Sequence, residues 1–160
     1  MSRSDWADVH SKCSSASPGV YRIRLACDGK PVAIPRFLET DVDGILAIGK
    51  SICLEDRRSK FPGAVKRGRG HSEINLLHVL ERFSSLSVVH PGAGYEYAFI
   101  PLRTKEEAEA EESRLLKTYL LRFGEVPPLN SAIPGGRYAS DSWAPFASVK
   151  VRRVEPKASA

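Results

Sequence analysis

The sequence predicts an α+β fold in which helices flank a small central antiparallel sheet of about three strands. An alternating strand pattern runs into Asp28-Gly29, a pair of residues favoured in tight β-hairpin turns. Further along the chain, residues 72–83 and 105–123 carry apolar side chains at the three- and four-residue spacing of amphipathic helices. A chain of 160 residues is long enough for one domain with a substantial core.

The first predicted strands lie in the N-terminal half of the chain. Residues 20–25 alternate apolar side chains with arginines, which predicts a half-buried strand with Tyr21 on the core face. Residues 31–37 would be the return strand, and their two prolines place it at the sheet edge. The apolar run at residues 45–48 predicts the central strand, and Gly49 is expected to let the chain turn sharply into a helix.

Three helices are predicted after that run. The first covers residues 51–61 and is expected to end at a Pro-Gly pair, and the second covers residues 72–83. The third covers residues 105–123, where Thr104 and Glu107 form a capping box at its start. A glycine and two prolines follow the third helix and should prevent it from continuing.

Two more strands complete the predicted elements. Residues 95–100 are aromatic and alternating, and residues 147–154 predict a short strand. We expect residues 1–17 to be a flexible N-terminal segment, residues 18–132 to form the core, and residues 133–160 to be a C-terminal extension that packs on the core or trails from it.

Charge and cysteine content narrow the classes of function. The net charge is +5, and residues 57–69 hold six basic residues and no acidic one. Such a cluster suits a polyanion such as nucleic acid, although a solvated face is the commoner explanation. The three cysteines have no paired spacing, which argues against a disulfide framework or a zinc site and favours a cytoplasmic setting. No apolar run approaches the length of a membrane span.

Glu112 is the most informative single residue of the sequence. It falls inside the apolar stripe of its predicted helix, between Ala108 and Leu115. A carboxylate on an inner face must be paired, hydrogen-bonded or bound to a cation. A buried salt bridge to an arginine and a metal-binding role are therefore both open.

Three other residues have both a structural and a functional explanation. Arg57 could hold phosphate oxygens in a cleft or could simply cover its own helix. Tyr21 could be an ordinary core tyrosine with its hydroxyl at the rim. His71 precedes a helix start, where neutral imidazole is favoured, so it could accept a proton or serve as a loop residue.

Several segments together resemble the GIY-YIG nuclease family. Pro18-Gly19-Val20-Tyr21 resembles the first motif, and Ala47-Ile48-Gly49 resembles the second with alanine in the place of its tyrosine. Arg57 stands ten residues after Ala47, as the family's arginine does after the motif tyrosine. Glu112 stands three residues before a Leu-Leu pair, and Asn130 closes a Pro-x-Leu-Asn-type segment. The stretch between the two motifs is longer than in the compact members of the family, and in this respect the chain resembles the restriction-enzyme-like members.

The resemblance implies a GIY-YIG-like core and a metal-dependent DNA endonuclease. Glu112 would bind Mg²⁺ or Mn²⁺, and Tyr21, helped by His71, would act as or position the general base. Arg57 would hold the charge that develops on the phosphate, and Asn130 would brace the site. The residues expected to contact DNA backbone phosphates are Lys50, Arg58, Lys66, Arg67 and Arg69.

A catalytically impaired module of the same fold is the alternative, and it would bind nucleic acid or a partner protein. Ala47 favours this alternative, because the motif tyrosine is missing. No separate DNA-reading domain is evident in the sequence. Specificity for a DNA target would therefore come from loops, from a homodimer or from a separate specificity subunit.

Overall fold

The computed structural model describes residues 6–8, 15–68, 70, 72–83 and 86–131. His71 and Arg69 lie outside the described residues. So do most of residues 1–17, all of residues 133–160 and the strand predicted at residues 147–154.

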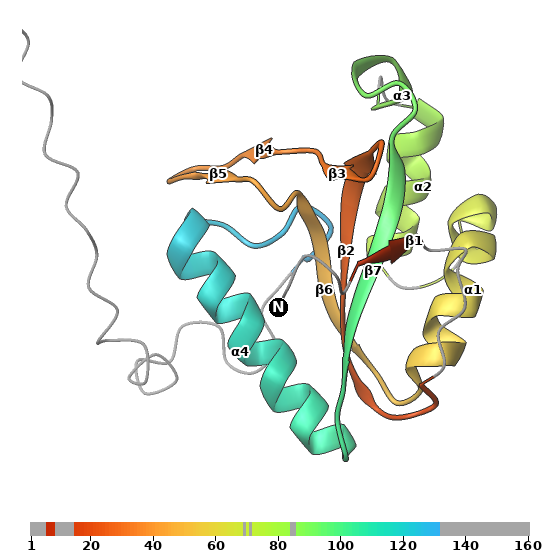
Figure 1. Ribbon diagram of the computed structural model, residues 1–160, viewed down its shortest axis with the longest axis vertical. Coiled ribbons are helices and arrows are strands. Elements are labelled where there is room, and N and C mark those ends of the chain that lie inside the picture. Colours follow the sequence, from red (N-terminus) through yellow and green to blue (C-terminus); the bar gives the residue numbers. More distant parts are fainter. Residues whose placement is uncertain (1–5, 9–14, 69, 71, 84–85, 132–160) are drawn as a thin grey trace, which may run out of the picture.

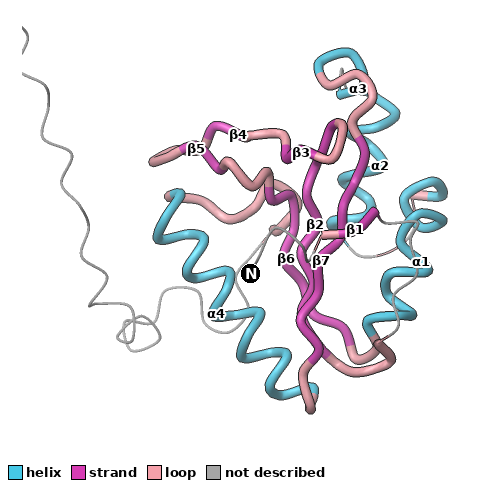
Figure 2. Tube along the Cα trace, in the orientation of Figure 1, coloured by secondary structure: helices cyan, strands magenta, loops and turns pink. Residues whose placement is uncertain are grey.

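An antiparallel five-stranded sheet forms the centre of the molecule (Figures 1 and 2). Its strands are β1 (Ala7–Asp8), β2 (Gly19–Cys27), β3 (Lys30–Pro31), β6 (Ile45–Ser51) and β7 (Gly94–Pro101). Strand β2 lies between β6 and β7, and its end also pairs with β3. The prediction that residues 45–48 form the central strand was therefore wrong. Their apolar run arises because Ile45 and Ile48 pack in one core and Ala47 packs in another.

The face of β2 that was expected to meet solvent is covered. Arg24 is only 5% exposed, and its Nε donates a hydrogen bond to Glu96 Oε2 at 2.7 Å. Its guanidinium lies 4.2 Å from the centre of the Trp6 ring. A buried arginine requires such a partner. The ion pair with Glu96 of β7 thus allows Arg24 to lie on an inner face, although arginine is usually exposed.

The turn at Asp28-Gly29 is formed as predicted. Both residues have positive φ, at 50° and 70°, as a tight hairpin turn requires. The return strand is broken into the two-residue strands β3 and β4 (Ile34–Pro35), because proline cannot donate to a strand ladder. Strand β4 pairs with β5 (Thr40–Asp41) in a separate two-stranded sheet.

Helix α1 is longer than the sequence predicts. It covers Leu54–Arg67, contains Pro62, and ends at Gly68, whose φ of 60° is left-handed. The expected end at Pro62-Gly63 was wrong, because Ala64 and Val65 beyond the proline are buried in the core. Packing of this apolar face outweighs the hydrogen bond that proline removes.

The helices α2 (Ser72–Phe83) and α4 (Lys105–Phe123) have their predicted bounds. The short helix α3 (Leu86–Val89) was not predicted from the sequence. Thr104 Oγ1 accepts a hydrogen bond from the backbone N–H of Glu107, and Gly124 ends α4 with φ 77°. Capping at both ends makes the bounds of α4 locally determined.

Helices cover both faces of the sheet (Figure 1). One core, which includes Tyr21, Phe61, Leu77 and Tyr97, packs α1 and α2 on one face. A second core packs Leu116 and other residues of α4 on the opposite face. This arrangement confirms the α+β class. None of the helices in the described ranges is both long and apolar enough to cross a membrane.

Candidate functional site

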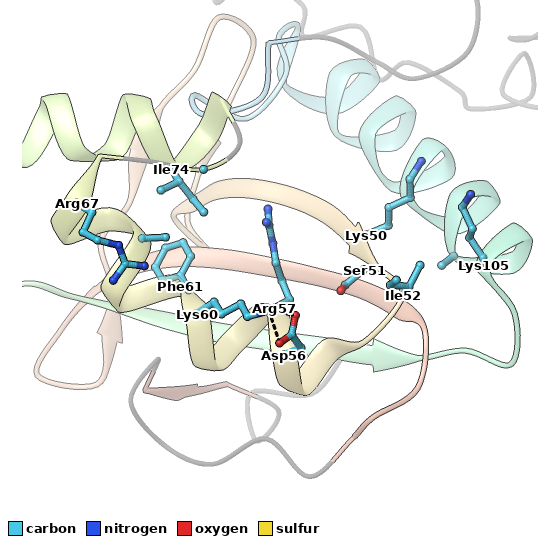
Figure 3. Close-up of a pocket in the computed structure, with 13 residues that line it drawn as sticks. Lys50, Ser51, Ile52, Asp56, Arg57, Lys60, Phe61, Arg67, Ile74 and Lys105 are labelled. Carbon is cyan, nitrogen blue, oxygen red and sulfur yellow. Dashed lines mark hydrogen bonds and ion pairs between the residues drawn. The ribbon is translucent and has the colours of Figure 1, made fainter.

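A cleft of about 620 Å³ opens where the end of β6 meets α1 and the starts of α2 and α4. Its basic lining residues are Lys50, Arg57, Lys60, Arg67 and Lys105, and its acidic lining residue is Asp56. In Figure 3, Arg57 stands between Arg67 on one side and Lys50 and Lys105 on the other. A hollow lined by cations concentrates positive potential and so attracts phosphate groups.

The Tyr21 hydroxyl belongs to a hydrogen-bond network beside this cleft. It donates to Glu73 Oε1 at 2.8 Å and accepts from Arg57 Nε at 3.0 Å. Arg57 Nη2 also donates to the hydroxyl and forms an ion pair with Glu73. The structure thus brings together Tyr21 and Arg57, which the sequence assigned to one site, and adds Glu73.

Gly49 makes this network possible by leaving space for Tyr21. The two residues face each other across β2 and β6. A Cβ at position 49 would lie 2.5 Å from both Cζ and Oη of Tyr21. The strand continues through Gly49 to Ser51, so the sharp turn expected at Gly49 is not formed. Glycine is needed here for a close approach of a side chain.

Burial keeps the Tyr21 hydroxyl protonated. Desolvation is the main cause that raises its pKa, and the neighbouring Glu73 carboxylate raises it further. Arg57 opposes both effects without cancelling them. Of the two roles expected for Tyr21, its surroundings favour positioning over direct action as a base.

Glu112 lies on the inner face of α4, as its place in the apolar stripe predicts. It is 9% exposed, and its Oε2 lies 3.3 Å from Lys50 Nζ. The same Nζ lies 3.4 Å from Glu109 Oε1. The partner of Glu112 is therefore a lysine of β6, and the arginine considered from the sequence was wrong.

The charge on Glu112 is only partly compensated. Burial raises the pKa of its carboxyl, Lys50 lowers it, and Glu73 raises it again. Because the Glu73 charge raises the pKa of Glu112, the two carboxylates repel each other across the site. Glu112 Oε2 also has no hydrogen-bond donor in good geometry within the described residues.

Glu112 is a suitable ligand for a divalent cation, because its carboxylate is nearly buried and Lys50 compensates its charge only in part. Among the residues that the structure describes, no three of His, Cys, Asp or Glu surround a common point. Mg²⁺ in nucleic-acid enzymes is commonly held by one or two carboxylates, with water and substrate phosphates as the other ligands. Glu112 could hold Mg²⁺ or Mn²⁺ in that way.

Asn130 braces β6 through its side-chain amide. Its Oδ1 accepts from the backbone N–H of Ile48 at 2.9 Å, and its Nδ2 donates to the Ile48 carbonyl at 2.8 Å. These bonds satisfy backbone groups on the outer edge of β6. Asn130 therefore acts on the strand that carries Gly49 and Lys50.

Arg58 does not lie where a DNA-contacting residue was expected. It is 3% exposed, and its guanidinium lies 5.8 Å from the centre of the Tyr97 ring. It shares the inner face of α1 with Leu54 and Phe61, at helical spacing. Its assignment to substrate binding was wrong, because a surface role requires the opposite side of the helix.

The remaining predicted contacts differ in position. Lys50 and Arg67 line the cleft, whereas Lys66 is exposed on α1 without lining it. Arg69 and His71 lie outside the described residues. The described part of the basic run is thus divided among the cleft, the core and the outer surface.

Ala47 lies within the core under α1 and α2. It is 1% exposed and faces Ile23, which in turn faces Tyr97 on β7. The Tyr97 ring stacks on Tyr21, with centres 5.5 Å apart and planes 14° apart. The aromatic neighbour of Tyr21 therefore comes from β7.

Sequence reasoning missed Glu73. The residue sits in the first turn of α2, where an acidic side chain is expected simply because of the helix dipole. Nothing in its spacing distinguishes it from the other acidic residues at helix starts. Its hydrogen bond to Tyr21 spans 52 positions of the chain, so only the tertiary structure reveals it.

Comparisons of the chain with protein-family models, with curated proteins and with solved structures find no match.

Proposed function

We propose that the protein is a metal-dependent DNA endonuclease that hydrolyses phosphodiester bonds in the basic cleft. The proposal depends on one observation: two basic side chains that line the cleft each contact a residue predicted to be catalytic. Arg57 lines the cleft and contacts Tyr21, and Lys50 lines it and contacts Glu112. These residues come from four different elements, β2, β6, α1 and α4, and their convergence supports a common site.

The side chains divide the proposed reaction between them. Arg57 and Lys50 bind the scissile phosphate and hold the negative charge that develops on it. The protonated Tyr21 hydroxyl orients the attacking water, with His71 as the proposed helper. A divalent cation on Glu112 would polarise the phosphate and stabilise the leaving oxygen.

Other cleft cations would bind DNA without reading its sequence. Lys60, Arg67 and Lys105 suit contacts to backbone phosphates. Target choice would then depend on a homodimer, a separate specificity subunit or loops of this chain. Cys27 and Cys53 are free thiols, which suits the cytoplasmic location that we propose.

A binding module without catalysis is the second candidate. Lys50 pairs with Glu112 and Glu109, so the carboxylate proposed to hold the metal is already partly neutralised. In this case the cleft would grip nucleic acid and leave it intact. Ala47, in the place of the motif tyrosine, also favours this candidate.

Nicking of supercoiled plasmid separates the two candidates. We expect cleavage with Mg²⁺ or Mn²⁺, and none with a chelator or in the Glu112→Gln variant. Glu111→Gln is the matched control, because Glu111 is the neighbouring residue and pairs with Arg114 away from the cleft. DNA binding without nicking would support the binding module, and absence of both would contradict both candidates.

A further inference from the structure

Two donors converge on one oxygen of Glu73. Its Oε1 accepts the Tyr21 hydroxyl at 2.8 Å, and Arg57 Nη2 donates to the same atom. Side-chain exposure is 14% for Arg57 and 16% for Glu73, and Tyr21 is 2% exposed. A hydroxyl and a guanidinium directed at one negatively charged oxygen form an oxyanion site.

Two other cleft cations, Lys60 and Lys105, are also paired, but with partners that are more exposed than Glu73. Lys60 pairs with Asp56 through side chains that are 70% and 54% exposed, and Lys105 pairs with Glu109 through side chains 60% and 45% exposed. Exposed ion pairs are weak, because water and salt screen them. The Arg57–Glu73 pair is screened less than these two pairs, so Glu73 competes with an incoming anion more strongly than Asp56 or Glu109 does.

We propose that Glu73 occupies, in the ligand-free protein, the subsite for a phosphate oxygen of the substrate. A DNA phosphate would replace the Glu73 carboxylate and receive the Tyr21 and Arg57 hydrogen bonds in its place, and the phenol oxygen would orient the attacking water as an acceptor. Ile74, the residue after Glu73, and Arg57, its ion-pair partner, both line the cleft, so the exchange would take place at the cleft wall. This inference rests on the proposed function, because it assumes that the cleft receives a phosphate backbone.

The exchange makes Glu73 a restraint on substrate binding. Any anion that lacks enough contacts elsewhere in the cleft must compete with an internal carboxylate at an effectively high local concentration. A polyanion with several phosphates gains from Lys50, Lys60 and Arg67 as well. The site therefore favours a nucleic-acid backbone over a single phosphate ion.

Substitution of Glu73 by glutamine tests the proposal. The amide keeps the shape of the side chain and removes its charge, so it accepts from Arg57 less strongly. We expect Glu73→Gln to bind a short fluorescein-labelled DNA duplex about tenfold more tightly than the wild type, as loss of a charge-assisted competitor implies. Fluorescence anisotropy in the presence of a chelator measures this without any cleavage.

Glu55→Gln is the matched control. Glu55 is exposed in the first turn of α1, and its substitution changes the net charge by the same amount. A general electrostatic effect would tighten DNA binding equally in both variants. The proposal requires a clearly larger gain from Glu73→Gln.

Absorbance titration of tyrosine tests the network without DNA. Glu73 helps to raise the pKa of Tyr21, so Glu73→Gln should lower the pH at which this phenol ionises. Comparison with Tyr21→Phe identifies the signal of Tyr21 among those of the other tyrosines. An unchanged Tyr21 titration would show that Glu73 does not hold the hydroxyl in solution.

The outcomes separate this inference from the proposed function. If the wild type binds DNA and Glu73→Gln binds equally or less tightly with an intact melting curve, the inference is overturned and the proposed function stands. If neither protein binds DNA, both are overturned. Should Glu73→Gln fail to fold, Glu73→Asp serves instead: its shorter carboxylate should give a smaller gain, and weaker binding would contradict the inference.

Discussion

Because Gly49 has no side chain, the Tyr21 ring has room to reach the candidate site. The Tyr21 ring lies against the Cα of Gly49, which brings the hydroxyl within reach of Arg57 and Glu73. Since Tyr21 is held by stacking on Tyr97 and by three hydrogen bonds, its ring has little freedom to move aside.

We predict that Gly49→Ala destabilises the protein and disturbs the Tyr21 network. The added Cβ would overlap the phenol, and overpacking of this kind costs about 1–3 kcal/mol. Thermal or urea unfolding measures the loss. Gly94→Ala is the control, because a Cβ at Gly94, also in a strand, meets no atom within 4 Å. Equal stability of the two variants would show that the Tyr21 ring can move aside to accommodate the added Cβ.

Glu112→Gln should remove cleavage while leaving the fold intact. The substitution removes the ligand charge at nearly constant volume, and the side chain of Lys50 is 34% exposed and can be hydrated when it loses its partner. We therefore expect a change in unfolding free energy of less than about 1 kcal/mol. Loss of a fully buried pair would cost ~3–5 kcal/mol, so unfolding curves distinguish the two cases. Normal cleavage by this variant would exclude Glu112 from the mechanism.

At the scale of the elements, α1 presents different faces to the core and to the cleft. Arg58 joins Leu54 and Phe61 on the inner face, while Arg57 and Arg67 reach the cleft. Adjacent basic residues of one helix therefore have different roles.

Lys66 and Arg67 provide a matched pair for testing the cleft. We expect Arg67→Glu to weaken DNA binding and to reduce the slope of log affinity against log salt by roughly 1, since a lost phosphate contact releases fewer counterions. Lys66→Glu, on the next residue but outside the cleft, should change the slope less. Titrations at several salt concentrations measure both slopes. Equal effects would mean that α1 attracts DNA only through its overall charge.

Strand β6 carries the departure from the GIY-YIG pattern. Ala47 is buried beside Ile23, in the core that also holds Tyr97 and Phe61. We predict that Ala47→Tyr lowers stability by roughly 1–3 kcal/mol, because a ring must be inserted into a filled core. Unfolding experiments and single-turnover cleavage on the same variant test this. A stable variant with raised cleavage would show that the space for the motif tyrosine is retained.

At the scale of the whole molecule, both cores contain tyrosines whose ionisation is suppressed. Burial is the first cause that raises the pKa of Tyr21, Tyr95 and Tyr119. The neighbouring carboxylates Glu73, Glu81 and Asp41, respectively, add to the increase. These tyrosines keep their protons in the native state at pH values where the unfolded chain has lost them.

This difference predicts that stability falls at alkaline pH. Above the usual tyrosine pKa of about 10, the native state binds more protons than the unfolded state, so the free energy of unfolding decreases as pH rises. The stabilisation is fully present below that pH. Melting temperatures across the alkaline range measure the effect. Tyr119→Phe should make the decrease shallower, and an unchanged decrease would contradict the assignment to Tyr119.

Several elements could be predicted from the sequence because their signals are local. The bounds of α4 follow from Thr104 and Gly124, and the first hairpin follows from Asp28-Gly29. The inward position of Glu112 follows from helical periodicity alone. Each of these features depends on residues that are close together in the sequence.

The distant residues that complete the site could not be predicted, because packing between elements brings them together. Strand order, the extension of α1 past Pro62 and the burial of Arg58 all depend on packing between elements. The same holds for the pairing of Glu112 with Lys50 and of Tyr21 with Glu73. Local propensities are free energies of a few tenths of a kcal/mol to about 1 kcal/mol per residue, whereas burial of large side chains and ion pairs contributes more, so packing decides where the two conflict.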